Sequence, residues 1–134
     1  MMWPEPVERI AAFLRESDAI GRLEELPPGT DAPPGPGARA EAFDCDGRTL
    51  VVLVPADRAV DEQRLVRRAG CRSLRPGEPR TFPFQGTLVL VDRSLLSQRT
   101  VWLEAGSPRH VLGLAPSQLL RLTRGETGVL VAAD

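Results

Sequence analysis

The side chains that could do chemistry in this sequence gather in its last third. His110 is the only histidine, and it ends the run Gly106-Ser-Pro-Arg-His110 between two strand-like segments. Asp92 closes an apolar run, a place where a charged group can lie at the edge of a pocket. A turn cap is the commoner reason for such an aspartate, and a hydrogen-bonded structural role is the commoner reason for a lone histidine. Asp92, Gly106 and His110 are therefore candidate site residues that a structural role would also explain.

Several kinds of chemistry are excluded. All 17 basic residues are arginines, so the chain has no amine for a Schiff base or a lysine general base. A single histidine excludes multi-histidine metal sites, and no phosphate-binding glycine loop, CxxC or HExxH motif is present. No serine lies in a nucleophile-elbow context. We therefore expect no metal and no cofactor, with acid–base work left to His110, to carboxylates or to the substrate.

The net charge of −1 hides an uneven distribution. Residues 5–46 hold ten acids and four arginines, a sum of −6, whereas residues 64–80 hold six arginines and one glutamate, a sum of +5. A local positive block can guide a polyanion, because screening limits the field to roughly 8–10 Å. The same block could be a solvated helix face whose arginines pair with nearby acids. The sequence leaves both interpretations open.

Length and composition indicate one α+β domain over residues 1–134. Hydrophobic residues make up 42% and charged residues 26%, the balance of a globular protein. The longest apolar run is strand-sized, and the first residues lack a secretion signal, so we expect a cytoplasmic protein that does not contact a membrane. Cys45 and Cys71 lack metal-ligand spacing, and we expect two small buried side chains with no sign of an oxidising compartment.

Three helices are expected. One begins at Pro4 and Pro6 with an apolar stripe and ends at residues 17–18. A second covers residues 60–69, with Asp61 near its start and Gly70 at its C-cap. The third begins at Pro116. Residues 27–37 and 75–86 are rich in proline and glycine and are expected to be loops.

The strands outnumber the helices. An Asp46-Gly47 turn between residues 40–43 and 49–54 predicts a hairpin, and the segment 19–26 could be a strand or a helical turn. Further strands are expected at 71–74, 87–91, 100–105 and 110–114, and residues 129–132 could close the sheet. These elements predict a mixed, largely antiparallel twisted sheet covered by a few helices.

The C-terminal half resembles a known family. The quoted segments are Leu88-Val-Leu-Val-Asp92, Thr100-Val-Trp-Leu-Glu-Ala-Gly106-Ser-Pro-Arg-His110 and Leu114-Ala-Pro-Ser-Gln-Leu-Leu-Arg-Leu-Thr123. With the hairpin at Asp46-Gly47-Arg48 and the pair Pro83-Phe84, their order resembles prolyl-tRNA editing domains of the YbaK type. The resemblance covers residues 39–132. It implies a pseudo-barrel sheet flanked by helices, like the domains associated with prolyl-tRNA synthetase.

The resemblance also implies an activity. Members hydrolyse a wrongly attached small amino acid from tRNA, as free-standing or synthetase-linked deacylases, by holding the ester and aiming water or a substrate hydroxyl at its carbonyl carbon. It implies catalytic roles for Arg39, Gly106 and His110, and substrate binding by Asp92, Pro83 and Phe84. The arginine block would supply tRNA contacts through three exposed residues, Arg67, Arg68 and Arg72. The expected partners are the acceptor end of tRNA and an aminoacyl-tRNA synthetase.

Three departures from the family surround the expected pocket. The family's functional lysine is replaced by Arg39, which can anchor an anion but cannot act as a neutral amine. Pro79 stands where the loop ending at Pro83 should begin with glycine, and proline has no N–H to donate. The proline-rich segment 27–37 stands where members of the family have a helix before the functional lysine. Three functions follow as hypotheses. The first is a trans-acting aminoacyl-tRNA deacylase, and the second is an inactive binding module of the same fold that captures tRNA or a synthetase. The third and less favoured is a small-molecule hydrolase that acts on free aminoacyl esters in the same pocket.

Overall fold

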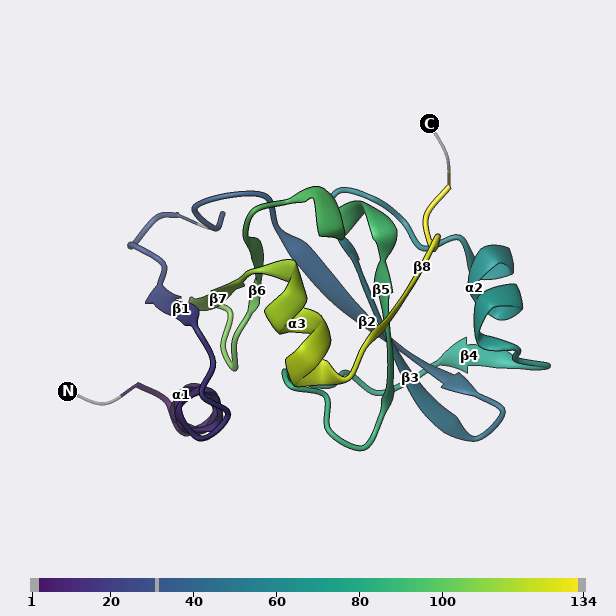
Figure 1. Ribbon diagram of the computed structural model, residues 1–134, viewed down its shortest axis with the longest axis horizontal. Helices are drawn as coiled ribbons and strands as arrows, with labels where there is room; N and C mark the ends of the chain where they lie inside the picture. Colours follow the sequence, from purple (N-terminus) through teal and green to yellow (C-terminus); the bar gives the residue numbers. More distant parts are fainter. Residues whose placement is uncertain (1–2, 31, 133–134) are drawn as a thin grey trace.

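The computed structural model describes residues 3–30 and 32–132, and its elements alternate between strands and short helices (Figure 1). The helices are α1 (Glu5–Glu16), α2 (Glu62–Ala69) and α3 (Pro116–Thr123), with a 3-10 turn, η1 (Arg93–Ser97). The strands are β1 (Gly21–Glu25), β2 (Ala38–Cys45), β3 (Arg48–Pro55), β4 (Leu74–Pro76), β5 (Leu88–Asp92), β6 (Val101–Glu104), β7 (His110–Leu114) and β8 (Glu126–Gly128). Among the described residues, no helix is long and apolar enough to span a membrane.

The strands form two sheets that do not close into a barrel. The larger sheet has the order β4-β2-β3-β5-β8, and the smaller has the order β1-β7-β6. The β3–β5 and β5–β8 pairs are parallel, while the other four pairs are antiparallel. An isolated bridge between Gly37 and Trp102 links the start of β2 to β6. The fold is therefore the mixed, largely antiparallel α+β architecture that the sequence predicts.

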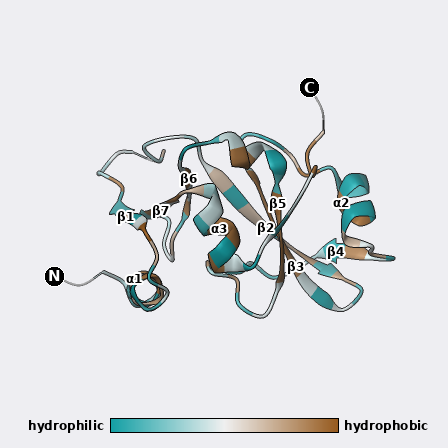
Figure 2. Ribbon diagram, viewed as in Figure 1, coloured by the Kyte–Doolittle hydropathy of each residue, from teal (hydrophilic) through white to brown (hydrophobic). Residues whose placement is uncertain are grey.

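The larger sheet separates two apolar cores. On one face, Val51 and Leu53 pack with Val91 and with residues from α1, α3 and the smaller sheet. On the other face, Leu50 and Val52 pack beneath α2. This arrangement follows from the two-residue period of strands, because every residue of the run 50–54 in β3 is apolar and both faces are covered. In Figure 2 the apolar residues accordingly run through the central strands.

Local signals fix the hairpin and α2. The Asp46-Gly47 turn has positive φ at both residues, 53° and 88°, which places the strands of a tight hairpin in register. Asp61 caps α2 by accepting hydrogen bonds from the backbone N–H groups of Gln63 and Arg64. Gly70 ends α2 in the left-handed conformation, at φ 73°. All three features agree with the sequence prediction.

Some predicted strands are displaced. The short strand expected at residues 71–74 is instead β4, which begins at Leu74, because a strand can pair only where it meets the edge of β2. The closing strand expected at residues 129–132 is β8, at Glu126–Gly128, and Val131 keeps only an isolated bridge to Val60. The ambiguous segment 19–26 contains strand β1, which pairs with β7.

The cysteine prediction is wrong in one respect. Cys45 and Cys71 are buried, as expected, but they are joined in a disulfide with a Cα–Cα distance of 5.5 Å. They meet because Cys45 ends β2 and Cys71 follows α2, and the chain then returns as β4 along the same edge of β2. The disulfide therefore ties the hairpin to the end of α2.

Asp46 predicts an acid-sensitive hairpin. Its carboxylate accepts hydrogen bonds from the backbone N–H groups of Arg72 and Ser73, and these bonds hold its pKa below the ordinary 3.8. A lowered folded pKa contributes stability above the ordinary value, and that stability is lost as the pH falls through the folded pKa. We expect Asp46→Asn to flatten the loss of stability below about pH 4. Urea unfolding between pH 2 and 7 measures this, and an unchanged acid limb would contradict it.

Candidate functional site

A pocket of about 310 Å³ is lined by residues of β2, of β6 and of the loop 79–84. Ala38 and Ala40 of β2 and Leu103 of β6 contribute small and apolar side chains to its lining. The loop contributes the buried rings of Phe82 and Phe84. The volume lies at the low end of the roughly 300–1,000 Å³ typical of ligand pockets, so a small occupant fits. We call this the β2-edge pocket.

Arg39 borders the pocket, but its guanidinium lies on the other face of the sheet. Arg39 pairs with Val54 in the β2–β3 register, and Val54 belongs to the core beneath α2. Residues directly opposite in a ladder share a face, so the Arg39 side chain also points to the α2 side. There it donates to Glu41 Oε2 at 2.8 Å and to the Arg58 carbonyl at 2.9 Å.

Two charges and a hydroxyl line the pocket together. Arg80 and Thr81 come from the loop, and Glu104 comes from the exposed end of β6. No ion pair among the described residues includes Arg80 or Glu104, although Arg80 donates a hydrogen bond to Thr49 Oγ1 at 3.3 Å. The pocket therefore offers the Arg80 cation. Glu104 lies at its rim: it pairs with Val111 in the β6–β7 register, and Val111 packs with Trp102, so the Glu104 side chain starts on the face opposite to Leu103.

The loop also offers backbone donors. Within the described part of the chain, no hydrogen bond is donated by the backbone N–H of Arg80, Thr81 or Phe82. Pro79, which precedes them, has no N–H. Unused N–H groups at a pocket wall are the kind of donor that stabilises the developing charge on a carbonyl oxygen.

His110 lies in another part of the molecule. It is 4% exposed, and its Nδ1 atom is 2.7 Å from the hydroxyl of Ser107. Nε2 has no hydrogen-bond partner among the described residues, and the nearest carboxylate oxygen, Glu25 Oε1, is 3.9 Å away. The Trp3 ring packs edge-on against it at 5.3 Å. None of the pockets described for this structure includes His110.

Gly106 lies beside α1. Its φ is 88°, and a Cβ atom at this position would come within 2.9 Å of the Pro6 carbonyl carbon and the Val7 nitrogen. The close backbone approach that the sequence suggested for a ligand is thus made by the first turn of α1. Gly106 and His110 are near each other in the chain, but the structure does not bring either to the β2-edge pocket.

Asp92 is a buried cap. One carboxylate oxygen accepts the backbone N–H of Leu130 at 2.8 Å, and the other accepts the backbone N–H and hydroxyl of Ser94. Both oxygens are thus engaged inside the protein, at 2% exposure. The carboxylate fixes η1 to the chain that follows β8.

Pro83 and Phe84 lie in the loop that separates the pockets. The Phe82–Pro83 peptide bond is cis, and Phe84 has a positive φ of 60°. Phe84 lines the β2-edge pocket, and both residues line a second pocket on the other side of the loop. Of the predicted residues, Arg39 and Phe84 therefore border the same pocket.

The predicted tRNA-binding arginines lie on and after α2. Arg68 is paired with Glu126 at 3.1 Å and also donates to the Thr127 carbonyl, so part of its charge is offset. Arg67 and Arg72 are exposed, and no ion pair among the described residues includes their side chains. Pairing with nearby acids therefore applies to Arg68, and tRNA binding by Arg67 and Arg72 stays a prediction.

Sequence reasoning missed Arg80, Thr81 and Glu104 as pocket residues. Arg80 and Thr81 lie just before Pro83, so their distance from the family's loop motif could have singled them out. Glu104 ends a strand-like run and precedes Gly106, the position of a pocket-edge group.

Comparisons with known proteins bear on the fold. No family model and no curated protein matches the chain. A solved structure of a proposed trans-editing enzyme for prolyl tRNA synthetase matches with a TM-score of 0.81 at 21% identity, over 98% of this chain and 100% of that one. A scaffold protein from computational epitope grafting matches with a TM-score of 0.82 at 20% identity, over 98% and 100%.

A longer protein contains the same arrangement. A proposed signal transduction protein from Marinobacter aquaeolei matches with a TM-score of 0.73 at 19% identity, over 98% of this chain and 31% of that one. Identities this low establish the fold and leave the activity open. The chain therefore has the α+β fold of the proposed trans-editing enzyme, the YbaK-like fold that the sequence resemblance predicts.

Proposed function

We propose that this protein is an aminoacyl-tRNA deacylase-like protein that acts in trans in the cytoplasm and removes a small, wrongly attached amino acid from tRNA of the proline type. The β2-edge pocket carries the proposal, because it combines a small apolar wall with the Arg80 guanidinium and has the Glu104 carboxylate at its rim. The likeness to the proposed trans-editing enzyme supports the same reaction class. We propose in addition that the protein associates with an aminoacyl-tRNA synthetase.

Each pocket group has a role in this reaction. An aminoacyl ester carries a positive α-ammonium group, which Glu104 would hold by a charge-assisted hydrogen bond. Arg80 would hold the ribose or phosphate of the terminal nucleotide, and Phe82, Phe84 and Leu103 would enclose a small side chain. Water attacks the carbonyl carbon, the ester bond to the ribose breaks, and the ribose oxygen leaves with a proton. The free N–H groups of the loop would stabilise the oxyanion.

We expect Glu104→Gln to lower kcat/KM for deacylation by about 10- to 100-fold, the effect of losing one hydrogen bond to a charged group. The substrates are proline tRNA charged with Ala, Cys or Pro, and released amino acid is measured against time. Glu62→Gln is the matched control, because Glu62 is an exposed acid in α2, outside the pockets described. Unchanged turnover in Glu104→Gln would remove the pocket from the proposal.

Arg39→Ala tests the family's anchor position in the same assay. Loss of turnover in a folded variant would mean that Arg39 holds the terminal nucleotide, although its guanidinium points toward α2 in this structure. Retained turnover would mean that Arg39 is not needed for this and would leave Arg80 as the residue that holds the nucleotide. If the native protein releases none of the three amino acids, the deacylase proposal fails. Binding of tRNA without release would then support the inactive binding module.

A further inference from the structure

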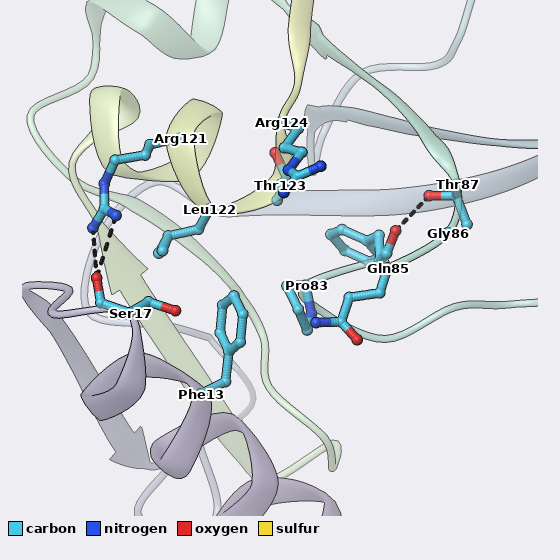
Figure 3. A pocket seen from close by; sticks show the side chains of 11 residues that line it. Phe13, Ser17, Pro83, Gln85, Gly86, Thr87, Arg121, Leu122, Thr123 and Arg124 are labelled. Carbon is cyan, nitrogen blue, oxygen red and sulfur yellow. Dashed lines mark hydrogen bonds between the residues drawn. The ribbon is translucent and has the colours of Figure 1, made fainter.

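A second pocket, of about 630 Å³, lies on the other side of the loop that holds Phe84 (Figure 3). It is bounded by the end of α1, the loop 83–87 and the last turn of α3. Figure 3 shows Arg121 reaching from α3 to Ser17 at one end of this pocket, with Gln85 on the facing loop. We call it the α1–α3 pocket. The deacylation proposed above makes no use of it.

The α1–α3 pocket has a positive lining. Arg121 and Arg124 line it, and no carboxylate of the residues that the structure describes does. Among the described residues, Arg121 donates only to neutral oxygens, the Ser17 carbonyl and the Gln118 side chain. Within residues 3–30 and 32–132, neither arginine takes part in an ion pair. Within the described part of the chain, both positive charges therefore lack a carboxylate partner.

Helix ends act against these charges but do not cancel them. α1 and α3 both end at the pocket, and each C-terminus carries about half a negative charge. Two guanidinium groups carry two full positive charges. The lining thus keeps an excess of positive charge, and it favours an anion.

Two residues that line the α1–α3 pocket have a positive φ, which is uncommon for residues other than glycine. Arg124 ends α3 with φ 55° and ψ 35°, a conformation that glycine or asparagine usually supplies at this position. Phe84 also has a positive φ, of 60°. Strained residues of this kind collect at ligand sites, where the side chain is retained for its interactions. Arg124 thus places a guanidinium at the pocket in a backbone conformation that glycine would adopt without strain.

The other walls define the rest of the ligand. Phe13 and Leu122 give an apolar surface, and Gln85 and Gly86 contribute a turn whose backbone N–H groups make no hydrogen bond among the described residues. Arg124 and the free N–H groups of the loop are donors of the kind that bind a phosphate, and the Phe13 ring in the same lining is a surface on which a nucleobase can stack. We propose that the α1–α3 pocket binds the phosphate and base of a nucleotide.

Calorimetric titration tests this proposal with adenosine monophosphate, adenosine and a short single-stranded oligonucleotide as probes. We expect the monophosphate to bind about tenfold or more tightly than adenosine, since the phosphate adds charge-assisted hydrogen bonds. Arg124→Gly and Arg124→Gln should each weaken binding of the monophosphate by about tenfold or more. Arg99→Gln, an exposed arginine outside the pockets described, is the matched control and should bind normally.

The Arg124→Gly variant separates binding from folding. Glycine adopts a positive φ without strain, so the thermal midpoint of unfolding of Arg124→Gly should equal or exceed that of the native protein. Tighter binding of the oligonucleotide than of the monophosphate would identify a polynucleotide as the source of the phosphate, and the reverse order would identify a free nucleotide. Equal affinities for adenosine and its monophosphate, absence of binding by every probe, or unchanged binding in Arg124→Gly would each overturn the proposal.

Discussion

Replacing Cys45 by alanine is expected to lower the free energy of unfolding by about 3–4 kcal/mol. The disulfide joins residues separated by 26 positions, so it restricts the unfolded chain by the entropy of closing that loop. For a chain of this size the loss corresponds to a fall of roughly 10–15 °C in the thermal midpoint. Urea unfolding at constant pH measures the free energy, and calorimetry measures the midpoint.

Reduction of the native protein is the internal control. A reductant should lower the stability of the native protein to nearly that of Cys45→Ala, and it should leave Cys45→Ala unchanged. Mass analysis after alkylation counts the free thiols in each sample. Two free thiols in the non-reduced native protein, with no effect of reductant on unfolding, would contradict the expectation.

Replacing Gly106 by alanine is expected to cost about 2–4 kcal/mol, from two causes. The added Cβ strains the backbone at φ 88°, and it overlaps the backbone of α1 at Pro6 and Val7, 2.9 Å away. Backbone atoms cannot move aside as a flexible side chain can, so α1 must shift. Chemical unfolding monitored by circular dichroism measures the loss.

Gly29→Ala is the matched control for Gly106→Ala. Gly29 has a similar φ, 80°, but an added Cβ would meet nothing within 4 Å. Its substitution should therefore show only the backbone strain, about 1–2 kcal/mol. Equal losses in the two variants would mean that α1 does not press on Gly106. A deacylation loss in Gly106→Ala that exceeds its unfolded fraction would restore a direct role for Gly106.

Turn and helix-capping residues, which act within a few residues of themselves in the chain, made much of the fold predictable. Asp46 and Gly47 define their turn within four residues, and Asp61 and Gly70 mark both ends of α2. Such signals depend on the backbone conformation of the residues that carry them, so the sequence is sufficient. The displaced strand near residue 74 shows the limit, because its bounds depend on where the chain meets β2.

The candidate site was less predictable, because it depends on where each side chain points and not only on where its residue stands in the sequence. Counting from the hairpin placed Arg39 near the expected pocket, and the structure places it on the pocket's border. A difference of one residue along a strand reverses the face of the sheet, so spacing alone did not show that its guanidinium points toward α2. The Cys45–Cys71 disulfide was missed for a related reason, since it joins segments brought together only by the fold.

The position of Phe84 has a consequence for the whole molecule. Its side chain is buried and borders both the β2-edge pocket and the α1–α3 pocket. An occupant that moves this ring on one side changes the free energy of binding on the other. Thermodynamic linkage requires the two effects to be equal: if a nucleotide alters the affinity for an aminoacyl group by some factor, the aminoacyl group alters the affinity for the nucleotide by the same factor.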